Sequence, residues 1–280
     1  MHILKVSKII NAPTMGNMEY AVVTVRASSF EGLMDPLLGF ELFRMRARTF
    51  RPRPFAGISI LTYLFDGSAA CHLLDTTGTD GLLQPGGFVW ATAGKGLVRA
   101  AFPEKTGTVA TGIQLLLNVH AEDKQSEPRV AVYSTVPGEV DSRVYTRTVM
   151  DTAAVRFMHI HLAWSESTTY ELPEGWNATI HLLWGAVRVQ TSSGGTELDS
   201  GTTVALGQSS VTERILVEAH EPSEVLLFSG VPIGEAAFGS ETMSMSSTEE
   251  LGKVLADYEE GKMGFITLTA GKWQIIPPAK

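Results

Sequence analysis

Two histidines separated by one residue are the most suggestive metal ligands in this sequence. His159 and His161 fall in the apolar and alternating run Phe157–Ala163, which predicts a β-strand. Side chains alternate along a strand, so both imidazoles would leave the same face, and His181 on a following predicted strand would supply a third nitrogen. No acidic residue is obviously placed as a fourth ligand. A histidine pair that faces solvent explains the same spacing, and we favour that interpretation over a metal site.

A second group of chemically active residues is a run of arginines. Arg44, Arg46 and Arg48 alternate along the chain, and further arginines follow them. If this segment is extended, the three guanidinium groups line one face, which would suit an acidic protein or a phosphate. Charged strand faces are more often solvated or paired within the molecule. We therefore favour a solvated or intramolecular role for this face.

Motifs for covalent or nucleotide chemistry are absent from the sequence. It contains no Gly-x-Ser-x-Gly nucleophile elbow, no P-loop and no dinucleotide fingerprint. Cys71 and His72 are neighbours on a predicted strand, so their side chains should leave opposite faces and form no dyad. The Gly94–Gly96 turn lacks the following helix that a phosphate-binding loop requires. No catalytic set is therefore visible.

The composition is that of an ordinary globular protein. The chain has 280 residues, of which 44% are hydrophobic and 19% charged, enough for one large or two ordinary domains. No apolar run approaches the ~20 residues that span a bilayer, and no secretory signal is visible. Cys71 is the only cysteine, which excludes an internal disulfide and a zinc-thiolate cluster. We expect a cytoplasmic protein that does not enter a membrane.

The net charge of −8 is unevenly distributed. Residues 1–135 carry 13 Lys and Arg against 11 Asp and Glu, whereas residues 136–280 carry 9 against 19. Affinity for nucleic-acid phosphates comes mostly from Lys and Arg. The acidic second half therefore argues against direct binding of nucleic acid.

Short strand-like segments separated by Gly, Pro and Asp turns recur along the chain, which is typical of an antiparallel all-β protein. A strand, a tight turn and a returning strand around Tyr63–Gly67 are echoed around Leu182–Gly185. The echo predicts two β-barrels of one kind. We place an N-terminal barrel at residues 1–135 and a C-terminal barrel at residues 136–280.

One helix is expected in the C-terminal part of the chain. Ser247 and Glu250 fit a capping box, and apolar residues at helical spacing follow them. Gly261 supplies a left-handed stop. The sequence therefore predicts a short helix over about residues 248–260, packed on a barrel.

Seven fragments, in the same order, resemble the pirin family of two-domain cupins. They include Arg53–Gly57, Gly94–Ala101, Leu226–Glu235 and Asp257–Gly264. The resemblance implies that both barrels are antiparallel cupin barrels, so the chain would be a bicupin. In the family, the first stretch reads His-Pro-His-Arg-Gly and the second ends His-Ser-Glu, and these residues bind an iron-type metal in the N-terminal barrel.

Laid on the family pattern, the four ligand positions of this chain carry Arg53, Phe55, Arg99 and Ala101. None of these side chains binds a divalent cation, because a guanidinium stays protonated and has no lone pair to donate. Ser59, where many cupins place a glutamate, adds a hydroxyl without a charge. We therefore expect a degenerate metal pocket and no cofactor.

Two interpretations of the pocket arginines stay open. In the first, Arg53 and Arg99 clamp a small anion such as a carboxylate or phosphate group, with Phe55, Ser59 and Ala101 beside it. In the second, each guanidinium is paired with a nearby acid or reaches water at the mouth of the barrel.

The resemblance implies two kinds of activity. Some pirins resemble quercetin-cleaving dioxygenases, and others act as regulatory partners of transcription factors or metabolic enzymes. Dioxygenation depends on a metal, so the residues at the ligand positions do not support it. We expect a non-catalytic role in binding a small anionic ligand or in regulating a protein partner. The alternative is a metal-dependent oxygenase that resembles quercetin 2,3-dioxygenase.

Overall fold

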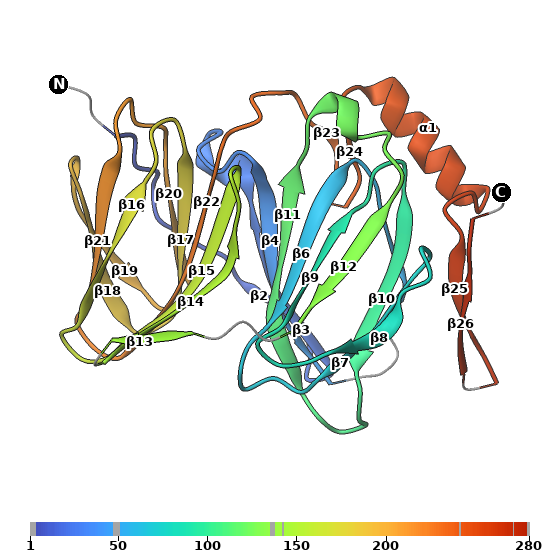
Figure 1. The fold of residues 1–280 in the computed structure, drawn as a ribbon, viewed down its shortest axis with the longest axis horizontal. Helices are drawn as coiled ribbons and strands as arrows, with labels where there is room; N and C mark the ends of the chain where they lie inside the picture. Colours follow the sequence, from blue (N-terminus) through green and yellow to red (C-terminus); the bar gives the residue numbers. More distant parts are fainter. Residues whose placement is uncertain are drawn as a thin grey trace. The chain divides into compact units, whose positions relative to one another are not determined.

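The computed structural model describes residues 4–46, 51–134, 138–141, 143–240, 242–270 and 272–278. In these residues the dominant element is the antiparallel β-strand, accompanied by one α-helix and the short 3-10 helices η1 (Ala27–Phe30) and η2 (Ala121–Asp123) (Figure 1). The predicted all-β class is confirmed. The chain forms two compact units, which we call the first and the second barrel.

The first barrel consists of residues 14–24, 38–135 and 233–280. A seven-stranded sheet has the order β12-β9-β6-β11-β4-β3-β2, and a four-stranded sheet has the order β5-β10-β7-β8. Apolar side chains from both sheets meet between them, as Phe55 and Leu97 do with Ile60 and Leu116. The strands are β2 (Thr14–Gly16), β3 (Tyr20–Arg26), β4 (Leu37–Met45), β5 (Arg53–Phe55), β6 (Ile58–Leu64), β7 (Cys71–Asp75), β8 (Asp80–Leu83), β9 (Phe88–Thr92), β10 (Leu97–Pro103), β11 (Ala110–Asn118) and β12 (Arg129–Tyr133).

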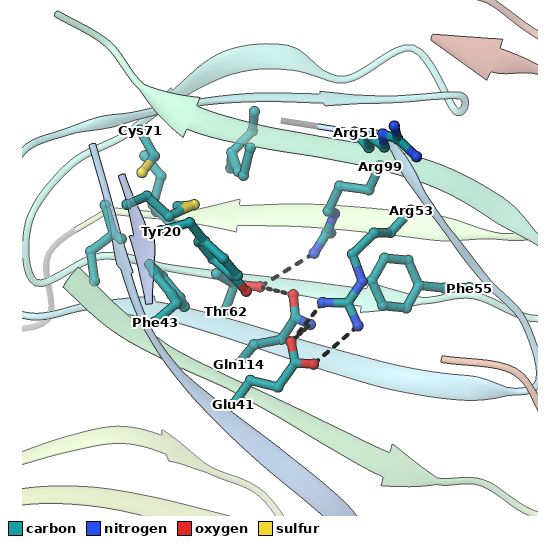
Figure 2. Close-up of a pocket in the computed structure, with 15 residues that line it drawn as sticks. Tyr20, Glu41, Phe43, Arg51, Arg53, Phe55, Thr62, Cys71, Arg99 and Gln114 are labelled. Carbon is teal, nitrogen blue, oxygen red and sulfur yellow. Dashed lines mark hydrogen bonds and ion pairs between the residues drawn. The ribbon is translucent and has the colours of Figure 1, made fainter. Parts of the chain in front are cut away.

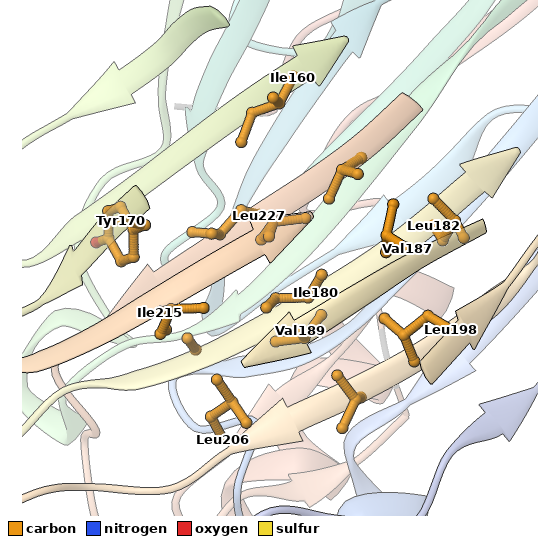
Figure 3. Packing of buried hydrophobic residues seen from close by; sticks show 14 of the residues in the cluster. Ile160, Tyr170, Ile180, Leu182, Val187, Val189, Leu198, Leu206, Ile215 and Leu227 are labelled. Carbon is orange, nitrogen blue, oxygen red and sulfur yellow. The ribbon is translucent and has the colours of Figure 1, made fainter. Parts of the chain in front are cut away.

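The second barrel consists of residues 1–13, 25–37 and 136–232 and repeats this plan. Its sheets have the orders β1-β20-β17-β22-β15-β14-β13 and β16-β21-β18-β19. Buried aliphatic side chains from alternate strand positions, such as Val187, Ile215 and Leu227, fill its interior (Figure 3). The strands are β1 (Ile10–Asn11), β13 (Glu139–Asp141), β14 (Val144–Asp151), β15 (Val155–Leu162), β16 (Ser167–Leu172), β17 (Asn177–Trp184), β18 (Ala186–Thr191), β19 (Gly194–Asp199), β20 (Thr202–Leu206), β21 (Glu213–Ala219) and β22 (Ser223–Gly230).

The N-terminal segment of the chain belongs to the second barrel, and the C-terminal segment belongs to the first barrel. Strand β1 pairs with β20 of the second barrel, where Ile10 lies opposite Thr203. The C-terminal segment, residues 233–280, belongs to the first barrel and packs against Val98 and Phe102 of β10. A division at residue 135 thus separates the central strands of the two barrels but not these terminal segments. The C-terminal segment contains β23 (Phe238–Gly239), β24 (Ser244–Met245), α1 (Thr248–Glu259), β25 (Phe265–Thr269) and β26 (Lys272–Ile276).

The predicted helix is confirmed as α1. Ser247 Oγ accepts a hydrogen bond from the backbone N–H of Glu250 at 3.1 Å, as the capping box requires. The Glu250 carboxylate reaches back one residue further than expected and accepts from the N–H of Ser246 at 3.0 Å. Gly261 follows with φ 75°, in the left-handed region that favours glycine. Within the described residues, no helix has both the length and the apolar character needed to cross a bilayer.

Candidate functional site

A pocket opens inside the first barrel at the positions to which the family resemblance points (Figure 2). Strand β5 contributes Arg53 and Phe55, and the neighbouring strand β10 contributes Arg99 and Ala101. The antiparallel register places Arg53 directly opposite Arg99. All four residues line the pocket, together with Tyr20, Glu41, Phe43, Met45, Arg51, Thr62, Leu64, Cys71, Leu73, Leu83 and Gln114.

The charge of Arg53 is neutralised by Glu41 on β4. The two side chains form a bidentate ion pair, with Arg53 NH1 2.6 Å from Oε2 and NH2 3.0 Å from Oε1. Gln114 Nε2 donates to the same carboxylate at 3.3 Å, and the Arg53 guanidinium lies 5.6 Å from the centroid of the Phe55 ring. Because one third of the Arg53 side chain is exposed, this pair lies at the accessible side of the pocket.

Arg99 is in a different environment. Only 5% of this residue is exposed, and its NH1 donates a long hydrogen bond of 3.4 Å to Thr62 Oγ1. Its buried NH2 has no hydrogen-bond partner among the residues that the structure describes. Burial lowers the pKa of Arg99 to about 10, although the nearby Asp75 carboxylate acts in the opposite direction. The pocket therefore contains a buried cation with an unused donor.

Ser59 does not belong to the pocket. Along β6, Ile58, Ile60 and Thr62 point toward the barrel interior, so Ser59 lies on the opposite face of the sheet. The hydroxyl that contacts Arg99 is that of Thr62. The sequence analysis assigned Ser59 to the pocket by analogy with other cupins. It did not identify Thr62, which lies on the face of β6 that points toward the barrel interior.

The sequence analysis also did not identify Glu41 and Gln114 as residues of the pocket. Glu41 is the one acidic residue of β4, in the run Leu37–Met45, and an isolated carboxylate among apolar residues is a usable signal. Gln114 is a polar residue between the apolar Ile113 and Leu115 on β11. Neither signal identifies the partner. Glu41 binds Arg53, which lies on another strand, and Gln114 donates to Glu41 from 73 positions further along the chain.

The residues of this pocket do not fit the metal that the family resemblance implies. A phenyl ring, a methyl group and two guanidinium groups occupy the four positions, and none of them offers a lone pair. The Glu41 carboxylate is already bound to Arg53, and burial raises the pKa of the Cys71 thiol to about 12, which keeps it protonated. The two positive charges also oppose the approach of a cation.

The prediction for Cys71 and His72 is confirmed. Cys71 faces the pocket, whereas His72 contacts Asp80 at 2.6 Å and lies against the ring of Phe102 on the other face of β7. The two side chains form no dyad.

The structure describes the arginine run only in part, with Arg44 and Arg46 among the described residues. Arg44 is exposed on β4 and donates to the carbonyl oxygen of Met18 at 3.1 Å. Arg48 lies outside the described residues.

The histidine pair of the second barrel differs from the expectation of two solvent-facing side chains. His159 is 1% exposed, and its Nε2 lies 2.6 Å from Oε1 of Glu224 on β22. His161 is half-buried and stands opposite Glu224 in the strand register. Glu224 is thus the acidic neighbour that the sequence did not reveal.

His181 does not complete the set. Leu226 on β22 lies between His159 and His181 in the register, so the histidines are two strand spacings apart, about 10 Å. His181 Nδ1 contacts Thr203 Oγ1 at 2.9 Å instead. Burial lowers the pKa of His181 to about 4.

Comparison with known protein sequences agrees with this architecture. The family model "Pirin" matches residues 30–117, and the model "Pirin C-terminal cupin domain" matches residues 157–264. Human pirin is 27% identical over 253 residues, which cover 83% of this chain and 84% of that protein. A pirin-like protein of Caulobacter vibrioides is 28% identical over 284 residues, which cover 94% of this chain and all of that protein, 100%.

Solved structures agree as well. Quercetin 2,3-dioxygenase from Acinetobacter baumannii superimposes with a TM-score of 0.81 at 18% identity, covering 93% of this chain and 98% of that chain. The pirin YhhW from Escherichia coli, solved in complex with nickel(II), superimposes with a TM-score of 0.63 at 16% identity, covering 82% and 99%. At these identities the likeness establishes the fold alone, and it confirms the two-barrel cupin architecture predicted from the sequence.

Proposed function

Because this chain belongs to the pirin family, we propose that it is a bicupin whose first barrel binds a small organic anion where its relatives' pattern places a metal. The role is one of ligand binding or regulation, and not of catalysis. The observation that supports it is the guanidinium of Arg99, which is buried in the pocket with one N–H donor group unused. An anion that accepts from this group would satisfy the unused donor and reduce the cost of burying the charge, which the nearby Asp75 carboxylate offsets only in part.

The geometry favours Arg99 as the first partner of the anion. Arg53 stands opposite Arg99, but its charge is already balanced by Glu41. An anion that binds Arg53 and Arg99 equally is therefore less favourable than one that accepts a charge-assisted hydrogen bond from Arg99. Arg53 and Gln114 then lie at the accessible side of the pocket. The Glu41 carboxylate also disfavours a ligand with two negative charges, such as a phosphate monoester.

The walls of the pocket indicate the rest of the ligand. Phe43, Phe55, Leu64 and Leu73 present apolar surface around the buried charge. Ligand pockets of this type bury an apolar body and orient it with few polar groups. We therefore propose a monocarboxylate with a planar or aliphatic apolar body.

The alternative function is a metal-dependent oxygenase that resembles quercetin 2,3-dioxygenase. That chemistry requires a metal in the first barrel, and the side chains at the four positions do not supply ligands. Under our proposal the purified protein carries no iron, copper, manganese or nickel in this pocket and does not turn over quercetin, with or without added metal. Elemental analysis, combined with anomalous diffraction to locate any metal, tests the first statement directly.

Ligand binding is tested with benzoate and its neutral isostere benzamide. Benzoate should raise the melting temperature of the full chain in a concentration-dependent way, and benzamide should not. The effect should weaken as salt is added, because the accessible side of the pocket is partly solvated. In Arg99→Met the benzoate effect should disappear. Equal stabilisation by the two compounds, or an unchanged response in Arg99→Met, would contradict the proposal.

Two parts of the proposal concern the cell. A cytoplasmic location suits a chain with a single, buried cysteine, and cell fractionation tests it. A regulatory role requires a protein partner that distinguishes the ligand-bound form. Affinity capture with and without a ligand that passes the benzoate test would identify such a partner.

A further inference from the structure

Three potential metal ligands converge on one face of the second barrel. None of them takes part in the function proposed above. They are His159 and His161 on β15 and Glu224 on β22. One candidate ligand atom from each residue can be chosen so that all three lie within 4.8 Å of one another. The convergence follows from strand geometry, because the histidines are two positions apart on one strand and His161 is the register partner of Glu224.

We propose that His159, His161 and Glu224 form a binding site for a divalent transition-metal cation of the Zn²⁺ type. Two imidazole nitrogens and one carboxylate oxygen are ligands of borderline hardness, which suit Zn²⁺ and its neighbours better than Ca²⁺ or Mg²⁺. Three protein ligands leave a coordination position open for water or a small ligand. The site is separate from the anion pocket and does not depend on it.

The carboxylate is already ordered for this role. His159 Nε2 lies 2.6 Å from Glu224 Oε1, a separation that needs only slight widening to admit a cation between them. The indole N–H of Trp184 donates to the other carboxylate oxygen, Oε2. Outer partners of this kind orient metal ligands and raise their affinity.

The site is accessible from solvent on one side. His159 is buried, but His161 is half-buried, the Glu224 side chain is 17% exposed, and the neighbouring Trp184 is an exposed residue. A cation can therefore reach the carboxylate and His161 without unfolding of the sheet.

One neighbouring charge opposes the cation. Arg147 on β14 is the register partner of His159, and its guanidinium lies 5.5 Å from the ring centroid of Tyr145, which in turn contacts the edge of His161. This positive charge lowers the affinity of the site. We therefore expect weaker zinc binding than in closed structural sites with four ligands.

The test is isothermal titration of the full chain with Zn²⁺ after treatment with a chelator. The expected result is saturable binding of one Zn²⁺ per chain. His161→Gln and Glu224→Gln should each weaken binding by more than about 100-fold, and Trp184→Phe, which removes only the outer hydrogen bond, by about 10-fold to 100-fold. Circular dichroism establishes that each variant is folded, and the buried His159 is left unchanged for this reason.

A matched control is available on the same barrel. His220 lies 3.0 Å from Glu197, which makes a histidine–carboxylate pair without a third ligand. His220→Gln should leave zinc affinity unchanged. Absence of saturable binding at millimolar Zn²⁺, or wild-type affinity in both folded ligand variants, would overturn the proposal. Because no benzoate is present in the zinc titration, its outcome is independent of the benzoate test.

Discussion

A buried guanidinium with an unused donor reduces the stability of a folded chain, and Arg99 is the residue in this position. Arg99→Met removes the charge while it keeps most of the apolar volume, and Thr62 keeps its contact with Gln114. We expect the ligand-free variant to be more stable than the wild type by about 1–3 kcal/mol. Chemical denaturation at pH 7 measures this change.

Arg99→Met also distinguishes a role of Arg99 in ligand binding from a role in stabilising the fold. If Arg99 is retained for ligand binding, Arg99→Met gains stability and loses its response to benzoate. A loss of stability in Arg99→Met would mean that the guanidinium has a structural partner in the native protein. Thr62→Val, which removes the acceptor for NH1 and keeps the shape, serves as the control and should destabilise.

His181 makes the stability of the second barrel sensitive to acid. Burial lowers its pKa from 6.5 to about 4, so below pH 6.5 the unfolded chain takes up a proton that the folded chain does not. The free energy of unfolding therefore falls as the pH falls from 6.5 to 4, by up to ~1.4 kcal/mol per pH unit. In His181→Gln this contribution is absent, and the loss between pH 7 and 4.5 should be smaller by about 2–3 kcal/mol.

Denaturation curves at several pH values test this difference in slope. Identical slopes in His181→Gln and the wild type would show that the imidazole is not held neutral by its surroundings.

At the scale of elements, β5 and β10 bring the four positions that resemble the family's ligand positions to one pocket. Arg53 and Arg99 are register partners, and Phe55 and Ala101 line the same pocket. Replacing the four residues by the family's ligands (R53H, F55H, R99H and A101E) should therefore create a site that binds one additional divalent metal per chain. The change also removes two positive charges and frees the Glu41 carboxylate.

Calorimetry with Ni²⁺ on the quadruple variant, relative to the wild type, counts the additional metal. The single variant Phe55→His keeps both arginines and should gain no site. If the quadruple variant folds like the wild type and binds no additional metal, the four side chains do not converge as the structure places them.

At the scale of the whole molecule, a buried lysine forms hydrogen bonds that link the C-terminal segment to the other strands of the first barrel. Lys124 is fully buried, and its Nζ donates to the carbonyl oxygens of Gly57 and Ser244 and to Oδ1 of Asn118, at 3.0, 2.9 and 2.7 Å. Ser244 belongs to β24, so the ammonium joins a strand near residue 57 to a segment almost 190 residues later. Sequence reasoning did not identify this residue.

Lys124→Met should destabilise the protein by at least about 2 kcal/mol, because it leaves three buried acceptors without a donor. Limited proteolysis should then release the segment 233–280 sooner than in the wild type. Lys95, which pairs with Glu127 on the surface, provides the control, and Lys95→Met should change stability by less than about 1 kcal/mol. Equal effects of the two variants would contradict the role assigned to Lys124.

The sequence by itself determined the class of the fold, the helix and the types of side chain at the pocket positions. Alternating apolar segments between turns predict strands because their period of two matches the pleat. The capping box at Ser247 is local and needs no tertiary contact. The inability of Arg53 or Phe55 to donate a lone pair is a property of the residue type alone.

Only the tertiary structure decided which of these residues meet and what surrounds them. Alternation separates the two faces of a strand, but it does not identify the residue that stands opposite on another strand. For this reason Glu41, the partner of Arg53, and Glu224, the neighbour of His159, were absent from the sequence-based sites. The burial of Arg99 likewise depends on residues from several strands that close over it. Such contacts are set by the register of strands that are distant in sequence, which no local pattern encodes.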